Sequence, residues 1–252
     1  AVVMLDWLDP AVLAFVGAGL ALWYALPTGG LAALVEQRPQ ELFTGMLIYD
    51  SVTVYIRALL LFFAVLFVVL VRMTGLADKT DGQDLFTLVL GATLGMCIMA
   101  SANHLMTVFL GVEMASVPSY VLAGSLKGRR RAGEAALKYA VSGAGAAGVM
   151  LYGTSLLAGV LGTAHLPSIA AELATIDFAF DGDGGKAMVL ALAGLMIMVG
   201  LAFKLSAVPF HFWCPDVFEG ATAEVNAFLS VASKAAALAL LVRVALGVST
   251  LP

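Results

Sequence analysis

The stretch AMVLALAGLMIMVGLAFKLSAVPFHFWCPDVFEG (residues 187–220) joins a long apolar run to a proline-rich break. Its first part, 187–208, is long enough to cross a bilayer, which takes about 20 mostly apolar residues in a helix. Within that part Lys204 is the only charged side chain. Pro209 and Pro215 then interrupt the pattern, because proline cannot continue a helical hydrogen-bond ladder. We predict a discontinuous helix, with a short second piece before the next span.

The whole chain shares this apolar character. Of its 252 residues, 62% are hydrophobic and 12% are charged, and the mean hydropathy is +1.00. A soluble domain carries about 25% charged residues, so this chain has too little polar surface to face water and must face lipid. No basic tail for nucleic acid is present. The two cysteines, Cys97 and Cys214, lie far apart and indicate neither a disulfide framework nor a metal site.

Seven apolar runs approach or meet the length of a membrane span. They lie at about 11–26, 46–71, 85–101, 103–126, 135–161, 187–208 and 224–247. No run alternates apolar and polar residues with the period of two that a membrane barrel requires. Open backbone is too costly in lipid, so we expect helices and no strands. The sequence therefore predicts an all-α fold, a polytopic bundle of membrane helices.

Charged loops predict the orientation of this bundle. The loop 127–133 holds the densest group of basic residues and is expected to face the cytoplasm or its equivalent. By alternation, loop 72–84 lies on the same side and loop 162–186 on the opposite side. The acidic residues of that outer loop are Glu172, Asp177, Asp181 and Asp183. Within it, Pro167 is placed to begin a short interfacial helix.

The segment SGAGAAGVMLYG (residues 142–153) is crowded with small side chains. Small residues let helix backbones approach closely in lipid, where apolar burial alone gives little drive to associate. A phosphate-binding loop would need a preceding strand and a Lys-Ser/Thr ending, which this segment lacks. We therefore predict tight packing of the 135–161 helix.

Three charged residues, Glu113, Lys204 and Lys234, lie deep within apolar runs. A charge at the centre of a lone membrane helix costs about 2.5–3.5 kcal/mol, so such residues face the protein interior and often mark ion or proton paths. Pro118 and Pro209 each follow a buried charge by five residues and free the carbonyl of the residue just after it. Transporters build ion sites from such interrupted helices.

These three residues also have plainer interpretations. A membrane glutamate such as Glu113 could be protonated and merely hydrogen-bonded, and Lys204 and Lys234 could belong to structural ion pairs. As a hypothesis, a carboxylate near Lys204 would switch the lysine between holding and releasing a proton as the carboxylate moves or is neutralised. Lys234 would then pass the proton onward.

Four further polar residues accompany the buried charges. His211, beside the break, fits a local hydrogen bond better than a proton carrier. Glu134 and Lys138 have the i,i+4 spacing of a stabilising pair at a helix start. Asp50 stands at the start of an apolar run, where an aspartate is placed to cap a helix.

A specific pattern runs through most of the chain: Glu, Glu-x-x-x-Lys, Lys-x4-Pro-Phe-His-x-Trp-x-Pro-Asp, then Ser-Lys. It is carried by FLGVEMASVPSYVLAG (109–124), EAALKYAVSGAGAAGVMLYG (134–153), FKLSAVPFHFWCPDVFEGATAEVNAFLSVASK (203–234) and, more weakly, FTGMLIYDSVTVYIRALLLFFAV (43–65). These segments resemble the antiporter-like subunit N of NADH-quinone oxidoreductase, respiratory complex I. An order this specific would rarely recur by chance.

The resemblance implies roles for single residues. Glu113 matches the family's fifth-helix glutamate, Lys204 the lysine at the break in the seventh helix, and Lys234 the lysine of the eighth. Glu134 and Lys138 match charged residues at the start of the sixth. In this family, proton movement is attributed to a chain of such groups along the middle of the membrane, driven by quinone reduction elsewhere in the complex.

The resemblance also implies a setting. The chain would be a subunit of a proton-translocating NADH:quinone oxidoreductase in an energy-transducing membrane, most simply the bacterial inner (plasma) membrane. Its partners would be other membrane subunits, which with the rest of the complex carry the NADH, FMN, iron–sulfur and quinone sites; no cofactor or metal is expected here. The family chain is about twice as long, with two inverted repeats. We therefore expect 1–252 to be a single, incomplete transmembrane domain, one half of an antiporter-like fold.

Two other classes of protein fit the same residues. A sodium/proton antiporter or membrane hydrogenase subunit of the same superfamily would share Glu113 and Lys204 but couple differently. A scaffold subunit that conducts nothing would keep the charges only as ties between helices.

Overall fold

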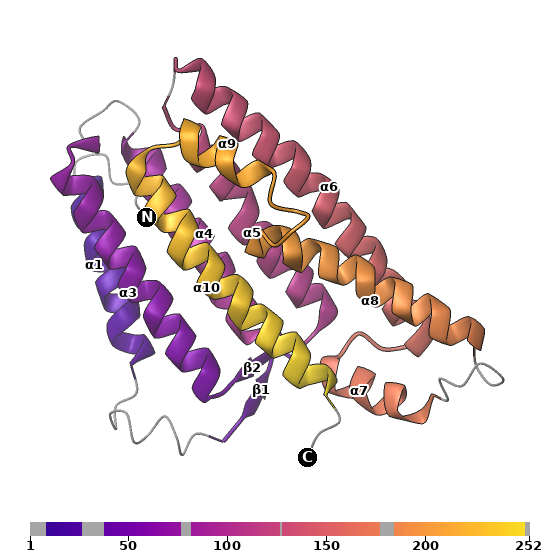
Figure 1. Cartoon of the computed structure of the whole chain (residues 1–252). Helices are drawn as coiled ribbons and strands as arrows, with labels where there is room; N and C mark the ends of the chain where they lie inside the picture. The colour runs from indigo at the N-terminus through magenta and orange to yellow at the C-terminus, as the bar shows by residue number, and fades with distance from the viewer. Residues whose placement is uncertain (1–8, 27–37, 77–81, 127, 177–183, 250–252) are drawn as a thin grey trace.

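The computed structural model describes residues 9–26, 38–76, 82–126, 128–176 and 184–249. In this part of the chain, long helices stand side by side with a small hairpin at one end (Figure 1). Six of the described helices are long and apolar enough to cross a membrane: α3 (Ser51–Met73), α4 (Gly82–Ser101), α5 (Leu105–Ala123), α6 (Arg130–Leu161), α8 (Gly184–Leu205) and α10 (Ala223–Val248). The prediction of an all-α membrane bundle is confirmed.

Shorter elements complete the described part: α1 (Pro10–Ala25), β1 (Gln40–Leu42), β2 (Leu47–Tyr49), α7 (Leu166–Thr175) and α9 (Trp213–Gly220). The helix expected at Pro167 is present as α7, with this proline in its first turn. Of the acidic residues expected beside it, Asp177, Asp181 and Asp183 lie outside the described residues.

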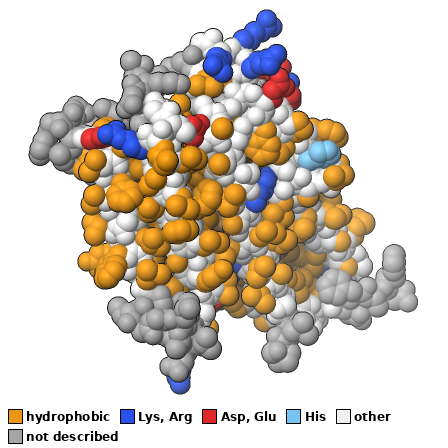
Figure 2. All heavy atoms as spheres, turned by 60° about the vertical axis from the view of Figure 1, so that its left-hand side comes forward, with side chains coloured by type: hydrophobic (Ala, Val, Ile, Leu, Met, Phe, Trp, Pro, Cys, Tyr) orange, Lys and Arg blue, Asp and Glu red, His pale blue; other side chains and the backbone are white. Residues whose placement is uncertain are grey.

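The two ends of the bundle differ in character. The connection between α5 and α6, with Arg129 before the helix, lies at what we call the basic end, at the top of Figure 1. The hairpin, the α4–α5 connection and α7 lie at the opposite end, the hairpin end. This alternation matches the predicted arrangement of loops, and the side that faces the cytoplasm stays a prediction. Figure 2 shows hydrophobic side chains covering the middle of one face, with most of its charged groups near one end.

The hairpin shows that the expectation of no strands was wrong. The run predicted as a helix from residue 46 begins instead with β2, which pairs antiparallel with β1. The helix α3 starts only at Ser51, where the Asp50 carboxylate accepts a hydrogen bond from the backbone N–H of Thr53 at 2.8 Å. This cap was predicted. Three-residue strands are too short to show a period of two, and these satisfy their backbone by pairing at the hairpin end.

Asn103 ties the elements of the hairpin end together. It lies in the short connection between α4 and α5, and its backbone N–H donates to Met46 O at 3.0 Å. Its carbonyl accepts from the backbone N–H of Leu166 at 3.0 Å, and its side-chain Nδ2 donates to Gly45 O at 3.2 Å. One buried polar residue thus joins the hairpin, the start of α5 and the start of α7.

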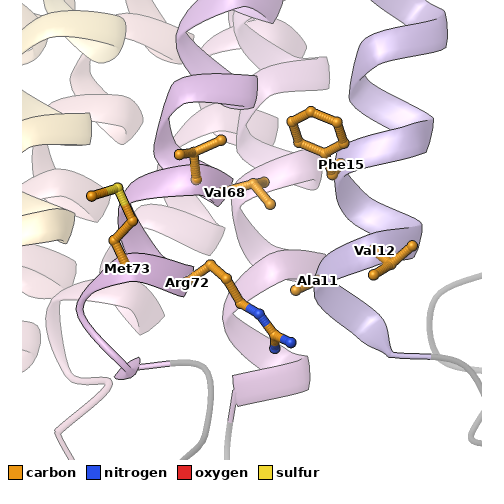
Figure 3. A pocket seen from close by; sticks show the side chains of 7 residues that line it. Ala11, Val12, Phe15, Val68, Arg72 and Met73 are labelled. Atoms are coloured by element: carbon orange, nitrogen blue, oxygen red, sulfur yellow. The ribbon is translucent and has the colours of Figure 1, made fainter.

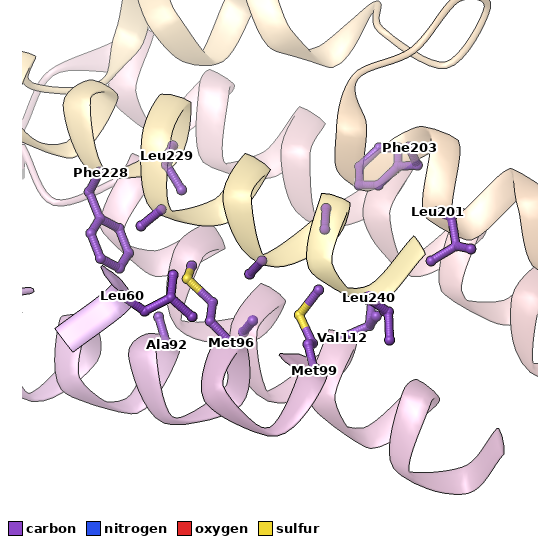
Figure 4. Close-up of a cluster of buried hydrophobic side chains, with 14 of the residues drawn as sticks. Leu60, Ala92, Met96, Met99, Val112, Leu201, Phe203, Phe228, Leu229 and Leu240 are labelled. Atoms are coloured by element: carbon purple, nitrogen blue, oxygen red, sulfur yellow. The ribbon is translucent and has the colours of Figure 1, made fainter. Parts of the chain in front are cut away.

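Small residues bring α6 and α8 close, as the 142–153 segment predicted. A Cβ atom added to Gly153 would lie 2.8 Å from the carbonyl oxygen of Ala193, and one added to Gly200 would collide with Met150. Figure 4 shows buried side chains of α10, such as Phe228, lying over Leu60 of α3 and Ala92 of α4. This close packing holds the charged residues of α5, α6, α8 and α10 within one bundle.

Candidate functional site

A groove between α1 and α3 is the least promising candidate for a site. Figure 3 shows its lining, which is apolar apart from Arg72. The Arg72 guanidinium lies 2.7 Å from the Asp9 carboxylate, which caps α1. The residues predicted to move protons lie elsewhere, where α5, α6, α8, α9 and α10 meet.

Lys204 is the most deeply buried of the three predicted charges. It lies in the last turn of α8 with 2% of its surface exposed, and its Nζ has no hydrogen-bond partner among the described residues. A buried charge without a partner is costly, so such groups need an explanation beyond packing. Glu113 of α5 and Lys234 of α10 both interact with Lys204 electrostatically.

Glu113 is half-buried on α5, and its Oε1 also lacks a hydrogen-bond partner within the described part of the chain. It interacts with Lys204 through space but forms no hydrogen bond with it. The helix continues through Pro118, so this proline does not interrupt α5. The carboxylate and the lysine therefore influence each other without a hydrogen bond that would fix either side chain.

The break after α8 has a defined end. The N–H of Ala207 donates to Ala202 O at 2.8 Å, and the N–H of Ser206 donates to Phe203 O at 3.0 Å. These two bonds are the Schellman pattern that closes a helix around one left-handed residue, here Ser206 with φ 55°. The chain then turns and resumes as α9, so the predicted discontinuous helix is confirmed.

One detail of the predicted break was wrong. We expected Pro209 to free the carbonyl of Leu205, but α8 already ends at Leu205, four residues before the proline. The carbonyl that is used is that of Lys204, which accepts a hydrogen bond from Lys234 Nζ at 3.0 Å. Helix termini leave such carbonyls open, and the end of α8 offers one to α10.

The described partners of Lys234 lie at the end of α8, in the break and at the start of α9. Besides Lys204 O, its Nζ donates to the Ser206 hydroxyl, and it lies 4.9 Å from the ring centre of Trp213. A cation over an indole face is attracted by the negative face of the ring. The structure thus brings Lys204 and Lys234 together through the end of α8.

Aromatic rings surround this point. Trp213 stacks on Tyr139 of α6 with centres 4.2 Å apart, and its Nε1–H donates to Phe203 O at 3.3 Å. Tyr139 also meets Tyr120 of α5 edge-on at 4.7 Å. The ring of Phe203 on α8 joins them, 5.2 Å from that of Trp213. This cluster was not predicted from the sequence, because its four rings lie on different helices and have no common spacing.

Glu134 and Lys138 form the predicted ion pair at 2.9 Å, near the basic end of α6. Both are exposed, and Lys138 also lies 3.1 Å from the Asp216 carboxylate of α9. A second pair, Arg131 with Glu219 at 3.0 Å, joins the same two helices. These residues lie at the surface between α6 and α9, and among the described residues none of their ion pairs reaches the buried lysines.

His211 lies in the break itself. Its ring stacks on Phe212 with centres 4.7 Å apart, and its Nδ1 is buried without a hydrogen-bond partner in the described residues. The local hydrogen bond that we expected is therefore not seen at this nitrogen. Among the residues that the structure describes, no group of three or more His, Cys, Asp or Glu side chains could hold a metal ion.

A buried ion pair at the hairpin end was missed. Arg243 of α10 binds Asp50 through two bonds, Nη1–Oδ2 at 2.6 Å and Nη2–Oδ1 at 2.8 Å. It also donates to Thr53 Oγ1 at 2.9 Å and to Ala100 O at 3.2 Å. Burial acts to raise the pKa of Asp50, but hydrogen bonds from Arg243 and Thr53 hold it below its ordinary value. The sequence feature that could have indicated this ion pair is an arginine, Arg243, within the apolar run 224–247.

Comparison with known proteins shows the family of the chain. A family model described as "NADH:quinone oxidoreductase/Mrp antiporter, TM" matches residues 102–250. The chain belongs to this family. It is 40% identical over 231 residues to NADH-quinone oxidoreductase subunit N 2 of Symbiobacterium thermophilum, covering 90% of this chain and 46% of that protein. It is 43% identical over 227 residues to subunit N of Rhodospirillum rubrum, with 90% and 45% covered.

Solved structures show the same architecture. Respiratory complex I from Thermus thermophilus with bound aureothin contains a chain that matches with TM-score 0.74 and 33% identity, over 96% of this chain and 50% of that one. An archaeal membrane-bound sulfane sulfur reductase matches with TM-score 0.73 at 18% identity, over 88% and 46%, which shows a shared fold alone. The resemblance drawn from sequence is confirmed, and the chain spans about half the length of the relatives that it matches.

Proposed function

We propose that this chain supplies one half of a proton path in the membrane part of an NADH-quinone oxidoreductase. The observation that carries the proposal is Lys204, a fully buried amine without a hydrogen-bond partner among the described residues, which interacts electrostatically with Glu113 and with Lys234. Intramembrane ionisable residues of this kind mark proton relays. The matched relatives are NADH-quinone oxidoreductase subunits, which favours this function over the sodium/proton antiporter, membrane hydrogenase and scaffold alternatives.

The proposed roles follow from charge and position. Glu113 attracts a proton onto Lys204, and moving or neutralising this carboxylate releases it. Lys234 carries a like charge, so a proton on one lysine disfavours a proton on the other. Lys234 passes the proton toward the rest of the path. His211, Glu134 and Lys138 are proposed as secondary members nearer the surface.

The energy comes from outside this chain. We propose that NADH, FMN, iron–sulfur clusters and quinone are bound by partner subunits, and that the chain binds other membrane subunits in a bacterial inner membrane. Quinone reduction would drive the movement of Glu113. No nucleic acid takes part.

The test is Lys204→Ala in the complete subunit within the intact complex. NADH oxidation and proton uptake into sealed membrane vesicles are measured together. We expect the complex to assemble, while protons moved per NADH fall. Leu201→Ala is the matched control, because Leu201 is 1% exposed on the same helix and carries no charge. A normal proton ratio in Lys204→Ala would end the proposal.

A further inference from the structure

Ser206 occupies a position that usually belongs to glycine. It is the left-handed residue that closes α8, with φ 55°. Glycine adopts this conformation freely, whereas a residue with a Cβ atom is strained in it. A serine at this point needs a reason that lies in its side chain.

That reason is the contact with Lys234. The left-handed turn brings the Ser206 hydroxyl to Lys234 Nζ, which also donates to Lys204 O at 3.0 Å. Trp213, the first residue of α9, offers its ring to the same ammonium at 4.9 Å. All three partners come from the two sides of the break, and none of them is a carboxylate.

We propose that Ser206 is a positioning residue that fastens Lys234 to the end of α8 and links the proton on Lys234 to the shape of the break. This inference rests on the proposed function. A protonated lysine offers charged donors to Lys204 O and Ser206 Oγ, and a cation to the Trp213 ring. Charge-assisted hydrogen bonds are about twice as strong as neutral ones, and the attraction to the ring needs the charge.

When Lys234 releases its proton, all three of these contacts therefore become weaker. The contacts from α10 then stabilise the break between α8 and α9 less. When Lys234 binds the next proton, these contacts stabilise the break again. In the described part of the chain, the titratable groups that act on Lys234 from the packed elements are Lys204 of α8, with a like charge, and the Cys214 thiol of α9. Glu113 interacts electrostatically with Lys204, and so influences Lys234 only indirectly.

Substitutions at Ser206 distinguish the contribution of its hydroxyl from that of its left-handed backbone conformation. Ser206→Gly keeps the left-handed turn without strain and removes the hydroxyl, so a role in helix closure alone predicts unchanged or better behaviour. We expect instead that the rate of proton movement in the assembled complex falls about threefold to tenfold, the effect of losing one hydrogen bond. Ser206→Asn, which tolerates the left-handed region and keeps an acceptor oxygen, should recover most of this loss.

The pH profile gives a readout that simple packing would not move. With Ser206→Gly, the alkaline limb of proton movement should shift to lower pH by about half a unit to one unit, because a tenfold change corresponds to one unit. Ala207→Gly is the matched control, since Ala207 is exposed and its methyl side chain cannot form a hydrogen bond with Lys234. Its rate and profile should be those of the unchanged complex.

A parallel Lys234→Met variant distinguishes the two proposals. If Lys234→Met pumps normally, the proposed function fails and this inference fails with it. If Lys234→Met loses proton movement while Ser206→Gly keeps the normal rate and pH profile, only the inference about Ser206 is overturned. Loss in Ser206→Gly with recovery in Ser206→Asn supports it.

Discussion

Arg243 and Lys204 are both basic side chains buried in membrane helices, with 6% and 2% of their surface exposed. Their surroundings are opposite. Arg243, at the hairpin end, binds both carboxylate oxygens of Asp50 and also Thr53 and Ala100 O. Lys204, at the break, has no hydrogen-bond partner for its Nζ in the described part of the chain.

The difference indicates that the charge of Arg243 stabilises the bundle, whereas the charge of Lys204 takes part in proton movement. A guanidinium stays charged and presents a rigid fork that fits a carboxylate, so its bonds do not depend on proton exchange. A lysine can gain and lose its proton, and a lysine without fixed partners is free to do so. We infer that Arg243 determines how α10 docks on α3 and α4, while Lys204 contributes to proton movement.

The largest expected effect is on assembly, in Arg243→Met. This change leaves Asp50 without its partner inside the bundle, and breaking a buried ion pair from one side costs about 3–5 kcal/mol. We expect the amount of assembled complex in membranes, measured by native electrophoresis, to fall at least about tenfold. Adding Asp50→Asn should restore part of it. If the complex with Arg243→Met alone accumulates normally, the Arg243–Asp50 pair is not needed to stabilise the bundle.

The next effect is on proton movement, in Glu113→Gln. The substitution removes the negative charge that acts on Lys204 and keeps the shape of the side chain, so assembly should be normal. Proton movement per NADH should fall about tenfold, since a nearby opposite charge is worth a pK unit or more. Glu219→Gln, at an exposed pair between α6 and α9, is the control. Equal behaviour of the two variants would remove Glu113 from the path.

The smallest effect is expected for Lys138→Gln. Lys138 is paired with Glu134 and Asp216, but all three side chains are well exposed, and such surface pairs contribute little. Proton movement and assembly should each change by less than about twofold. A large loss of proton movement with normal assembly would instead make Lys138 a main member of the proton path and not the secondary member proposed here.

Much of the fold could be predicted from the sequence. Long apolar runs predicted the spanning helices, Asp50 predicted a cap, and Pro209 with Pro215 predicted the break, because these signals are local. The hairpin was missed, since three-residue strands carry no periodic signal.

The candidate site was predictable only as a set of residues. Glu113, Lys204 and Lys234 were found because charges are rare in apolar runs. Their arrangement was not found: the bond from Lys234 to Lys204 O depends on where α8 ends, and the Arg243–Asp50 pair joins residues far apart in the chain. Such contacts depend on how distant helices pack, which spacing along one helix does not reveal.

The most direct test compares Lys204→Met with Arg243→Met in the complete complex. For each variant, the amount of assembled complex and the protons moved per NADH are measured in the same membrane vesicles. We predict that Lys204→Met assembles at the normal level or above, because it removes a buried unpartnered charge, while its proton ratio falls. Arg243→Met should show the reverse, with little complex but a normal proton ratio in what remains. A Lys204→Met complex that fails to assemble, or that assembles and keeps the normal ratio, would contradict the assignment of these two charges.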